Sequence, residues 1–328
     1  MLLSIAILIA GFVGLVWSAD RFVFGAAALA KNFGVPTLII GLTIVAMGSS
    51  APEMMVSAQA ALANQTDTAV GNAVGSNITN ILLVLGITAL LRPLNVSSGT
   101  LKREMPIVML VSIGAWYILS DNYFAFKEGV ALMAGFIIFL GGVAFIAIKQ
   151  SKTNQNSEID PFVEEACEDV PNNVSTGFAL LWLTIGMIIL PISSHFIVDS
   201  ATDIAKYFGL SDLVIGLTII AIGTSLPELA ACVAGVLKNE DDLALGNIIG
   251  SNIFNLLAVL SLAGMINPSA VDSAVSSRDI LVMLAATVAL IAMSLSIRGS
   301  RRINRFEGAL LLSAFVGYQI LIFTTLSA

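Results

Sequence analysis

Apolar segments long enough to cross a lipid bilayer recur along this chain from one end to the other. A membrane-spanning helix needs roughly 17–25 residues, and in lipid only helices and closed barrels satisfy every backbone hydrogen bond. The predicted spans are 2–19, 36–61, 69–91, 105–120, 128–148, 177–198, 211–236, 243–266, 279–297 and 306–326. Hydrophobic residues make up 57% of the chain and charged residues 11%, which leaves no large soluble domain. The sequence therefore predicts an all-α polytopic membrane protein with ten transmembrane helices.

The two halves of the chain repeat each other at an offset of 175 residues. The segment GLTIVAMGSSAPE at 41–53 reappears as GLTIIAIGTSLPE at 216–228. In the same register, GNAVGSNITNILLVLG at 71–86 reappears as GNIIGSNIFNLLAVLS at 246–261. From Gly41 onward, 23 of 46 aligned residues are identical without a gap, which indicates an internal duplication.

The duplication predicts two inverted five-helix repeats, 1–148 and 177–328. An odd number of helices in the first copy makes the second copy enter the membrane from the opposite face. Residues 149–176 form an acidic linker between the copies. Because the linker lacks the ligand spacing of an EF-hand loop, we expect a solvated tether rather than a calcium sensor.

The positions of the basic residues predict the orientation in the membrane. Of the 15 Lys and Arg residues, 12 fall in loops on the linker side, and only Lys127, Lys206 and Arg278 fall on the other. The side rich in Lys and Arg faces the cytoplasm in most membrane proteins. The linker is therefore predicted to be cytoplasmic, and both termini are predicted to lie outside.

Two glutamates, Glu53 and Glu228, lie at equivalent points inside predicted membrane spans. An acidic residue at the centre of a membrane helix costs roughly 2.5–3.5 kcal/mol, so such residues usually serve a function. A single glutamate could be kept protonated for packing. Two equivalent ones in an inverted repeat are expected to lie near the pseudo-twofold axis and to face each other across a shared cation site.

Each glutamate follows a proline, Pro52 or Pro227, which cannot donate a backbone hydrogen bond and therefore opens the helix. A plain kink is the alternative, but freed carbonyls in an opened membrane helix are good ligands for hard cations. Hydroxyl groups three or four residues before the glutamates share their helix face. These candidate ligands are Ser49, Ser50, Thr224 and Ser225.

Polar residues at intervals of four also mark the third span of each repeat. They are Asn72, Ser76 and Asn80 in the first copy and Asn247, Ser251 and Asn255 in the second. Amide oxygens of Asn80 and Asn255 would complete a site made only of oxygen ligands, which suits Ca²⁺ and Na⁺. One histidine, His195, and two cysteines, Cys167 and Cys232, are too few for zinc or haem chemistry, and no structural disulfide is expected.

The paired motifs G-S-S-A-P-E and G-T-S-L-P-E, each followed by G-N-x-x-G-S-N-I-x-N, resemble the calcium/cation antiporter (sodium/calcium exchanger) superfamily. The resemblance is to its short prokaryotic branch in bacterial inner membranes. It implies four clustered cation sites enclosed by the second, third, seventh and eighth helices, with the first and sixth helices sliding across them.

The resemblance also assigns the ligands residue by residue. The central acids match Glu53 and Glu228, and the hydroxyl and backbone ligands match Ser49, Ser50, Thr224, Ser225 and the carbonyl of Ala221. The outer ligands match Ser76, Asn80, Ser251 and Asn255. Some prokaryotic exchangers carry Asp where this chain has Asn255, so the ion stoichiometry of the family does not transfer directly.

We therefore expect a secondary active antiporter that exchanges Ca²⁺ for Na⁺ by alternating access. Two alternatives remain open: exchange of Ca²⁺ or another cation for H⁺, since buried carboxylates can carry protons, and a passive cation channel. An enzyme is not expected, because no catalytic Ser/His/Asp set is present. The expected partners are Ca²⁺, Na⁺ and the lipid bilayer, with no cofactor, nucleic acid or obligate protein partner.

Overall fold

The computed structural model describes residues 1–35, 40, 46–96, 104–153, 171, 173–238, 241–295 and 302–325, and most of them are helical. The first half contains α1 (Leu2–Asn32), α3 (Ala46–Gly48), α4 (Ala51–Leu62), α5 (Thr66–Ile78), the π-helical η2 (Thr79–Val84), α6 (Leu85–Leu91), α7 (Met105–Leu119) and α8 (Phe126–Thr153). The second half contains α10 (Thr176–Phe208), α11 (Asp212–Ile215), η4 (Gly216–Ile220), α12 (Ala221–Thr224), α13 (Leu226–Lys238), α14 (Asp241–Phe254), η5 (Asn255–Val259), α15 (Leu260–Ile266), η6 (Val275–Asp279), α16 (Ile280–Ser294) and α17 (Arg305–Thr325).

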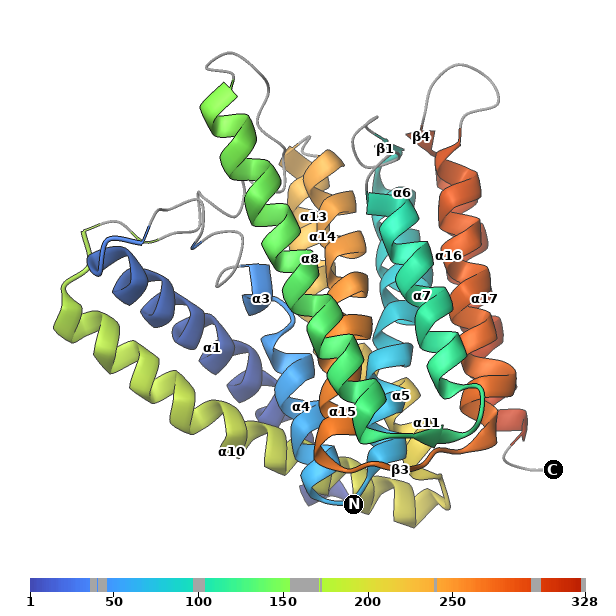
Figure 1. The fold of residues 1–328 in the computed structure, drawn as a ribbon. Coiled ribbons are helices and arrows are strands. Elements are labelled where there is room, and N and C mark those ends of the chain that lie inside the picture. The colour runs from blue at the N-terminus through green and yellow to red at the C-terminus, as the bar shows by residue number, and fades with distance from the viewer. Residues whose placement is uncertain are drawn as a thin grey trace.

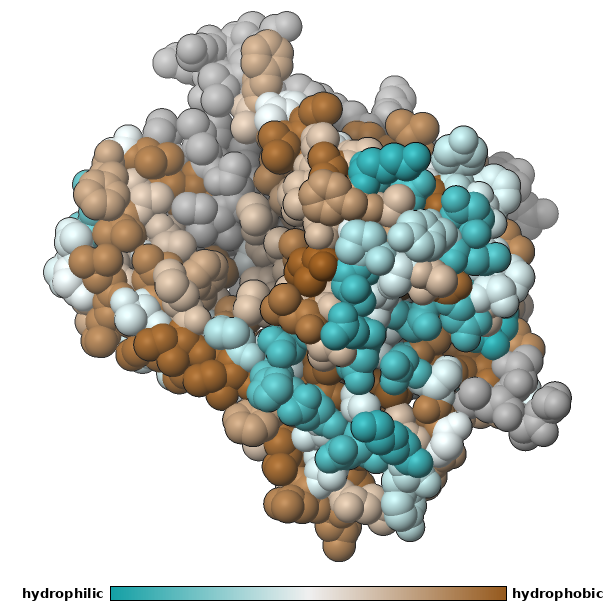
Figure 2. All heavy atoms as spheres, turned by 60° about the horizontal axis from the view of Figure 1, so that its bottom comes forward, coloured by the Kyte–Doolittle hydropathy of each residue, from teal (hydrophilic) through white to brown (hydrophobic). Residues whose placement is uncertain are grey.

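The predicted all-α membrane fold is confirmed. The described part of the chain contains 8 helices long and apolar enough to cross a bilayer, and α7 adds a shorter apolar helix of 15 residues. The remaining predicted span, 36–61, lies partly outside the described residues and ends in α4. Figure 2 shows hydrophilic side chains gathered over part of the end that comes forward, whereas many residues on the flanks are hydrophobic.

Helices α1 and α10, the first of each half, lie side by side and run obliquely to the main bundle (Figure 1). They pack closely at small residues. A Cβ atom on Gly25 would clash with the backbone of Leu183, and one on Gly186 would lie 2.7 Å from the Cα of Phe22. At these two glycines the helices approach each other closely enough for backbone contact.

The centre of the bundle is formed by the most buried spans, α5 with η2 and α14 with η5. A Cβ atom on Gly71 would lie 2.8 Å from the carbonyl oxygen of Leu213, and one on Gly75 would lie 2.8 Å from the Cα of Leu217. Helix α5 thus touches the segment from α11 to η4 backbone to backbone. Gly71 and Gly75 are four residues apart on α5, the spacing of small residues that lets two membrane helices approach closely.

Two short antiparallel strand pairs join the halves: β1 (Leu94–Asn95) with β4 (Arg302–Ile303), and β2 (Tyr123–Phe124) with β3 (Ser269–Ala270). Strands β1 and β3 each follow the third span of their half, and β2 and β4 each precede the fifth. Figure 1 places β1 and β4 at the end of the molecule opposite to β3. The two pairs are thus related as an inverted repeat requires.

The fifth helices are exchanged between the halves. Helix α8 packs on α15, and α17 packs on α6. In the second of these contacts a Cβ on Gly308 would lie 2.8 Å from the carbonyl oxygen of Gly86. Each half therefore completes the packing of the other, and neither is expected to fold alone.

Figure 1 also places the N-terminal end of α1 and the C-terminal end of α17 at one end of the molecule, with the C-terminal end of α8 at the other. The predicted linker, 149–176, falls largely on 154–170 and 172, outside the described residues, as does Cys167. Helix α8 extends to Thr153, and α10 begins at Thr176 with Ser175 as its N-cap. The predicted repeat boundaries at 148 and 177 remain predictions.

Candidate cation-binding site

Both halves interrupt a helix at the same point of the repeated motif. Between α3 and α4, Ser50 has φ −91° and ψ 4°, and between α12 and α13 the equivalent Ser225 has φ −85° and ψ 3°. A proline stands in the first turn of the helix that follows Ser50, where its missing N–H leaves no donor unsatisfied. The helices therefore open where the Pro-Glu pairs predict.

The two glutamates lie in the first turns of the helices that follow these breaks, Glu53 in α4 and Glu228 in α13. Each is 1% exposed, and the two carboxylates interact electrostatically with each other. Within the described residues, all four carboxylate oxygens are buried and have no hydrogen-bond partner. The positive ends of two helices thus support a pair of acids whose oxygens remain available to a cation.

Four predicted serine ligands belong to the same set of available oxygens. The hydroxyls of Ser50, Ser225, Ser76 and Ser251 are buried and have no partner in the described part of the chain. Leaving a buried polar group unpaired costs roughly 1–3 kcal/mol, so a cluster of such groups calls for an explanation. A bound cation coordinated by these oxygens supplies one.

The remaining hydroxyl and backbone candidates have protein partners or lie at the edge of the cluster. Thr224 is fully buried, and its hydroxyl donates to Asn72 Oδ1 at 3.3 Å and to the Ala221 carbonyl at 3.5 Å. The Ala221 carbonyl also accepts the N–H of Ser225 at 3.2 Å. Ser49 is half-buried in the helix break. Oxygen lone pairs of Thr224 and Ala221 can still bind a cation, because their bonds do not use every acceptor position.

The predicted amide ligands stand where the third spans change from α-helix to π-helix. Asn80 is the second residue of η2, and Asn255 is the first residue of η5. Segment η2 packs against α13, which carries Glu228, and η5 packs against α4, which carries Glu53. π-Helical turns are frequent at functional sites because they move side chains out of α-helical register. The crossed packing brings residues from both halves to one place.

Two polar residues of the site, Asn77 and Asn252, were missed by the sequence prediction, and Asn72 was placed in the polar stripe without a role of its own. Asn72 donates from Nδ2 to Ser57 Oγ at 2.9 Å and to the Glu53 carbonyl at 3.2 Å, so it ties the third span to the acidic helix. Asn77 and Asn252 bridge the two halves. Their signal was present in the repeated G-S-N, where the asparagine directly follows a predicted serine ligand.

The two halves differ at one support of the site. Ser57 is replaced at the equivalent position by Cys232, whose thiol is buried. Ser57 Oγ donates to the Ala69 carbonyl at 3.3 Å, and Cys232 Sγ makes the matching contact with the Ala244 carbonyl at 3.5 Å. Asn247 donates to Cys232 Sγ at 3.7 Å, as Asn72 does to Ser57. Cys232 therefore has a hydrogen-bonding role equivalent to that of Ser57.

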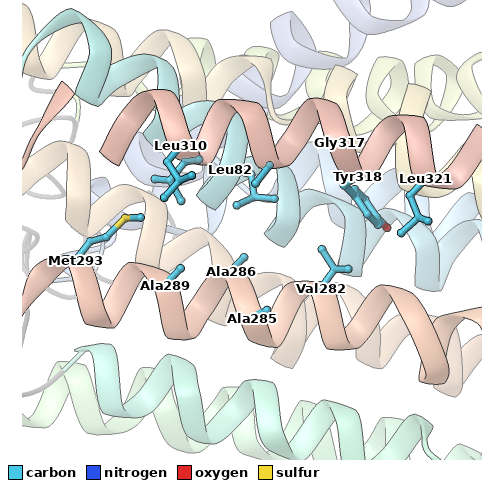
Figure 3. A pocket seen from close by; sticks show the side chains of 12 residues that line it. Leu82, Val282, Ala285, Ala286, Ala289, Met293, Leu310, Gly317, Tyr318 and Leu321 are labelled. Carbon is cyan, nitrogen blue, oxygen red and sulfur yellow. The ribbon is translucent and has the colours of Figure 1, made fainter. Parts of the chain in front are cut away.

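A crevice of about 410 Å³ lies between α16 and α17, away from these ligands (Figure 3). Its lining is almost entirely aliphatic, and Leu82 of η2 forms part of its wall. Beside it, Tyr318 donates to Asp279 at 2.9 Å, and Asp279 pairs with Arg278 at 2.7 Å. These polar groups satisfy one another, so the crevice offers little to a cation.

A membrane protein whose two halves interrupt equivalent helices beside buried oxygen atoms that lack partners among the described residues has the architecture expected of a secondary transporter for hard cations. The family described as sodium/calcium exchanger protein matches residues 3–145 and 178–324. The chain belongs to this family, in its prokaryotic branch, and is a cation antiporter of the calcium-exchanging class. The predicted family is confirmed.

Similarity to known relatives extends over nearly the whole chain. The chain is 53% identical to "Putative antiporter CaxA" of Alkalimonas amylolytica, covering 99% of this chain and 100% of the relative. It is 44% identical to inner membrane protein YrbG of Escherichia coli strain K12, covering 98% of both. A structure of the sodium-calcium exchanger NCX_Mj, soaked with Na⁺ and Sr²⁺, matches with a TM-score of 0.61 and 30% identity over 96% of this chain and 97% of that one.

Proposed function

We propose that the protein exchanges Ca²⁺ for Na⁺ across the membrane by alternating access at the site of Glu53 and Glu228. The observation that carries the proposal is the pair of buried carboxylates whose oxygens have no partner among the described residues. Oxygen atoms from carboxylates, amides, hydroxyls and carbonyls suit hard cations with flexible coordination, as Ca²⁺ has. The proposed exchange includes no chemical step and no cofactor.

The charge of the site limits its contents. With both glutamates ionised the site carries −2, which one Ca²⁺ or two Na⁺ neutralise. One Ca²⁺ and two Na⁺ carry the same total charge. Either can therefore replace the other without leaving a net charge on the site in a medium of low dielectric constant. Three Na⁺ would leave the loaded site at +1, so the stoichiometry determines whether transport carries current.

The oblique pair α1 and α10 is suited to open the site alternately to the two sides. A Cβ atom on Gly223 would clash with the ring of Phe12, and one on Gly48 would lie 2.6 Å from Val23. Both glycines stand just before the helix breaks, so α1 covers both interrupted helices. Sliding of α1 and α10 along the bundle would uncover one break and cover the other.

Exchange of Ca²⁺ for H⁺ is the second candidate, and one observation favours it. Glu53 and Glu228 are both buried, and the predicted outer ligands, Asn80 and Asn255, are neutral. Two neighbouring buried carboxylates can each take up a proton when the metal leaves. Protons could then neutralise the site as two Na⁺ do.

We further propose a place in a bacterial inner membrane, with both termini outside and the linker in the cytoplasm. The split of basic residues supports this orientation, and YrbG is named as an inner membrane protein. The protein needs no obligate protein partner for transport, since both halves of the site come from one chain.

Radiocalcium uptake by proteoliposomes tests the driving ion. Vesicles loaded with Na⁺ and diluted into Na⁺-free buffer should take up Ca²⁺, and uptake should stop when Na⁺ is equal on both sides. Uptake that ignores the Na⁺ gradient but follows a pH gradient, and collapses with a protonophore, would favour Ca²⁺/H⁺ exchange. Flux without any counter-ion requirement would indicate a channel.

A further inference from the structure

Four buried asparagines form a cluster where the third spans of the two halves meet. The asparagine quartet consists of Asn77 and Asn80 on α5 and η2, and Asn252 and Asn255 on α14 and η5. Each is at most 1% exposed. Asn252 is the equivalent of Asn77, and Asn255 is the equivalent of Asn80, at the offset of 175 residues. The quartet therefore contains two symmetry-related pairs.

One hydrogen bond in the quartet fixes the orientation of a predicted ligand. Asn80 donates from Nδ2 to Asn252 Oδ1 at 3.1 Å. The nitrogen and oxygen of a carboxamide point in different directions, so this bond turns Asn80 Oδ1 away from Asn252. That oxygen is buried and has no partner within the described residues. Asn252 thus holds Asn80 with its oxygen ready to bind a cation.

The pseudo-twofold symmetry predicts a matching set of bonds that the structure does not contain. Asn77 donates from Nδ2 to the carbonyl oxygen of Asn252 at 3.1 Å, but no bond runs from Asn252 Nδ2 to the carbonyl of Asn77. The counterpart of the bond from Asn80 to Asn252 would run from Asn255 Nδ2 to Asn77 Oδ1. Both of these atoms are buried and lack a partner in the described part of the chain.

The quartet is therefore asymmetric although its sequence is symmetric. Asn80 is oriented by a bond, whereas Asn255 has both polar atoms unpaired. An unpaired buried donor or acceptor is unfavourable, so an arrangement that forms the matching bonds is energetically accessible. An inverted repeat converts between its two facings by exchanging the conformations of its halves.

We propose that Asn252 and Asn77 are positioning residues, which orient the ligand amides of Asn80 and Asn255, respectively, and that the two bonds alternate with the facing of the transporter. In the conformation described here the bond from Asn80 to Asn252 is made. In the opposite facing the bond from Asn255 to Asn77 takes its place. This inference rests on the proposed function, because the oriented oxygens act on the transported cation.

A double-mutant cycle tests the positioning role. Equilibrium binding of radioactive ⁴⁵Ca²⁺ is measured on purified protein in nanodiscs for Asn252→Ala, Asn80→Ala and the double variant. Loss of one hydrogen bond should weaken Ca²⁺ binding by roughly three- to tenfold in Asn252→Ala. If Asn252 acts through Asn80, the double variant should bind Ca²⁺ as Asn80→Ala does, within about twofold.

A second cycle supplies the control. Ser50 is a predicted ligand outside the quartet, so the fold-losses of Ca²⁺ affinity caused by Asn252→Ala and by Ser50→Ala should multiply in the double variant. Multiplying effects of Asn252→Ala and Asn80→Ala would overturn the positioning role. Asn252→Leu, which keeps the side-chain volume, must give the same coupling as Asn252→Ala, and it serves where the alanine variant does not fold. Wild-type protein that binds no Ca²⁺ would overturn the proposed function and this inference with it.

The alternation has its own test in the sidedness of Ca²⁺ activation. Half-saturating Ca²⁺ is measured for exchange in oriented vesicles, once with Ca²⁺ varied at the cytoplasmic face and once at the outer face. Asn252→Ala should raise the half-saturating Ca²⁺ concentration mainly at one face, and Asn77→Ala should raise it mainly at the other face, each by roughly three- to tenfold. Equal changes at both faces, or changes of both variants at the same face, would overturn the alternation while leaving calcium exchange itself intact.

Discussion

Replacing either intramembrane glutamate with glutamine should abolish Ca²⁺ transport and leave the protein folded. Glu53→Gln and Glu228→Gln each keep an amide oxygen but lower the charge of the site from −2 to −1. Removing one member of a buried charged set typically costs about 3–5 kcal/mol, which corresponds to roughly a hundredfold to several thousandfold loss of affinity. Flux should therefore fall to background even at Ca²⁺ concentrations that saturate the wild type.

The stability of the same variants without Ca²⁺ should change in the opposite direction. Both carboxylates are 1% exposed, and their oxygens lack partners among the described residues, so neutralising one relieves repulsion and desolvation. We expect a gain of about 1–3 kcal/mol in the absence of Ca²⁺. Thermal unfolding in detergent measures it.

Glu307→Gln is the matched control for both measurements. Glu307 lies at the start of α17, and its carboxylate accepts the N–H of Asn304 at 2.7 Å, which an amide oxygen can also do. Transport should stay near the wild-type level in this variant. Near-normal calcium flux in Glu53→Gln or Glu228→Gln at saturating Ca²⁺ would refute a shared site.

Four further predictions follow from the sequence and the packing. A reporter fused after Ala328 should be detected outside the cytoplasm and one inserted near Asn156 inside it; a cytoplasmic C-terminus would contradict the inverted topology. Gly216→Ala should destabilise the protein by about 1–3 kcal/mol in thermal unfolding, because its Cβ would clash with the carbonyl of Thr68, whereas Gly141→Ala has open space and should not. Asn255→Asp should change the Na⁺ dependence of exchange more than its Ca²⁺ dependence, measured as separate half-saturating concentrations. Exchange of three Na⁺ for one Ca²⁺ should respond to an imposed potential by about 2.3 kcal/mol per 100 mV, and two-for-one exchange should not respond.

The sequence predicted the class of fold and the centre of the site because both depend on local rules. The length of the apolar segments marks the membrane spans, and the 175-residue repeat shows which span of one half is equivalent to which span of the other. Proline and glycine near Glu53 and Glu228 predicted the helix breaks, which the structure places at Ser50 and Ser225. These features follow from the backbone chemistry of a few neighbouring residues.

Contacts across the two halves could not be predicted in the same way. The bond from Asn80 to Asn252 joins residues 172 positions apart. No local pattern distinguishes a bridging asparagine from a ligand asparagine when both belong to one G-S-N-I-x-N motif. The exchange of α8 and α17 between the halves is likewise set by tertiary packing, since apolar helices of similar length can pack in many orders.

The support of the site by Ser57 and Cys232 illustrates a further limit. The repeat alignment pairs the hydroxyl of Ser57 with the thiol of Cys232, and the sequence alone does not show what either side chain contacts. In the structure both side chains contact a carbonyl of the following helix, at Ala69 and Ala244. Only the geometry reveals that a thiol fulfils the same role as a weaker hydrogen-bond partner.

The unpaired oxygens of the site place a demand on the rest of the fold. Buried acids, hydroxyls and amides without partners within the described residues each cost roughly 1–3 kcal/mol, so packing elsewhere must hold the interrupted helices in place. The backbone contact of α5 with η4, the exchanged fifth helices and the two strand pairs supply that packing around the site. Helices α1 and α10 pack most extensively on each other, and they lie obliquely beside the bundle (Figure 1). Rigid packing is thus concentrated where the ligands must be held, and the elements suited to move are those that carry none of the predicted ligands.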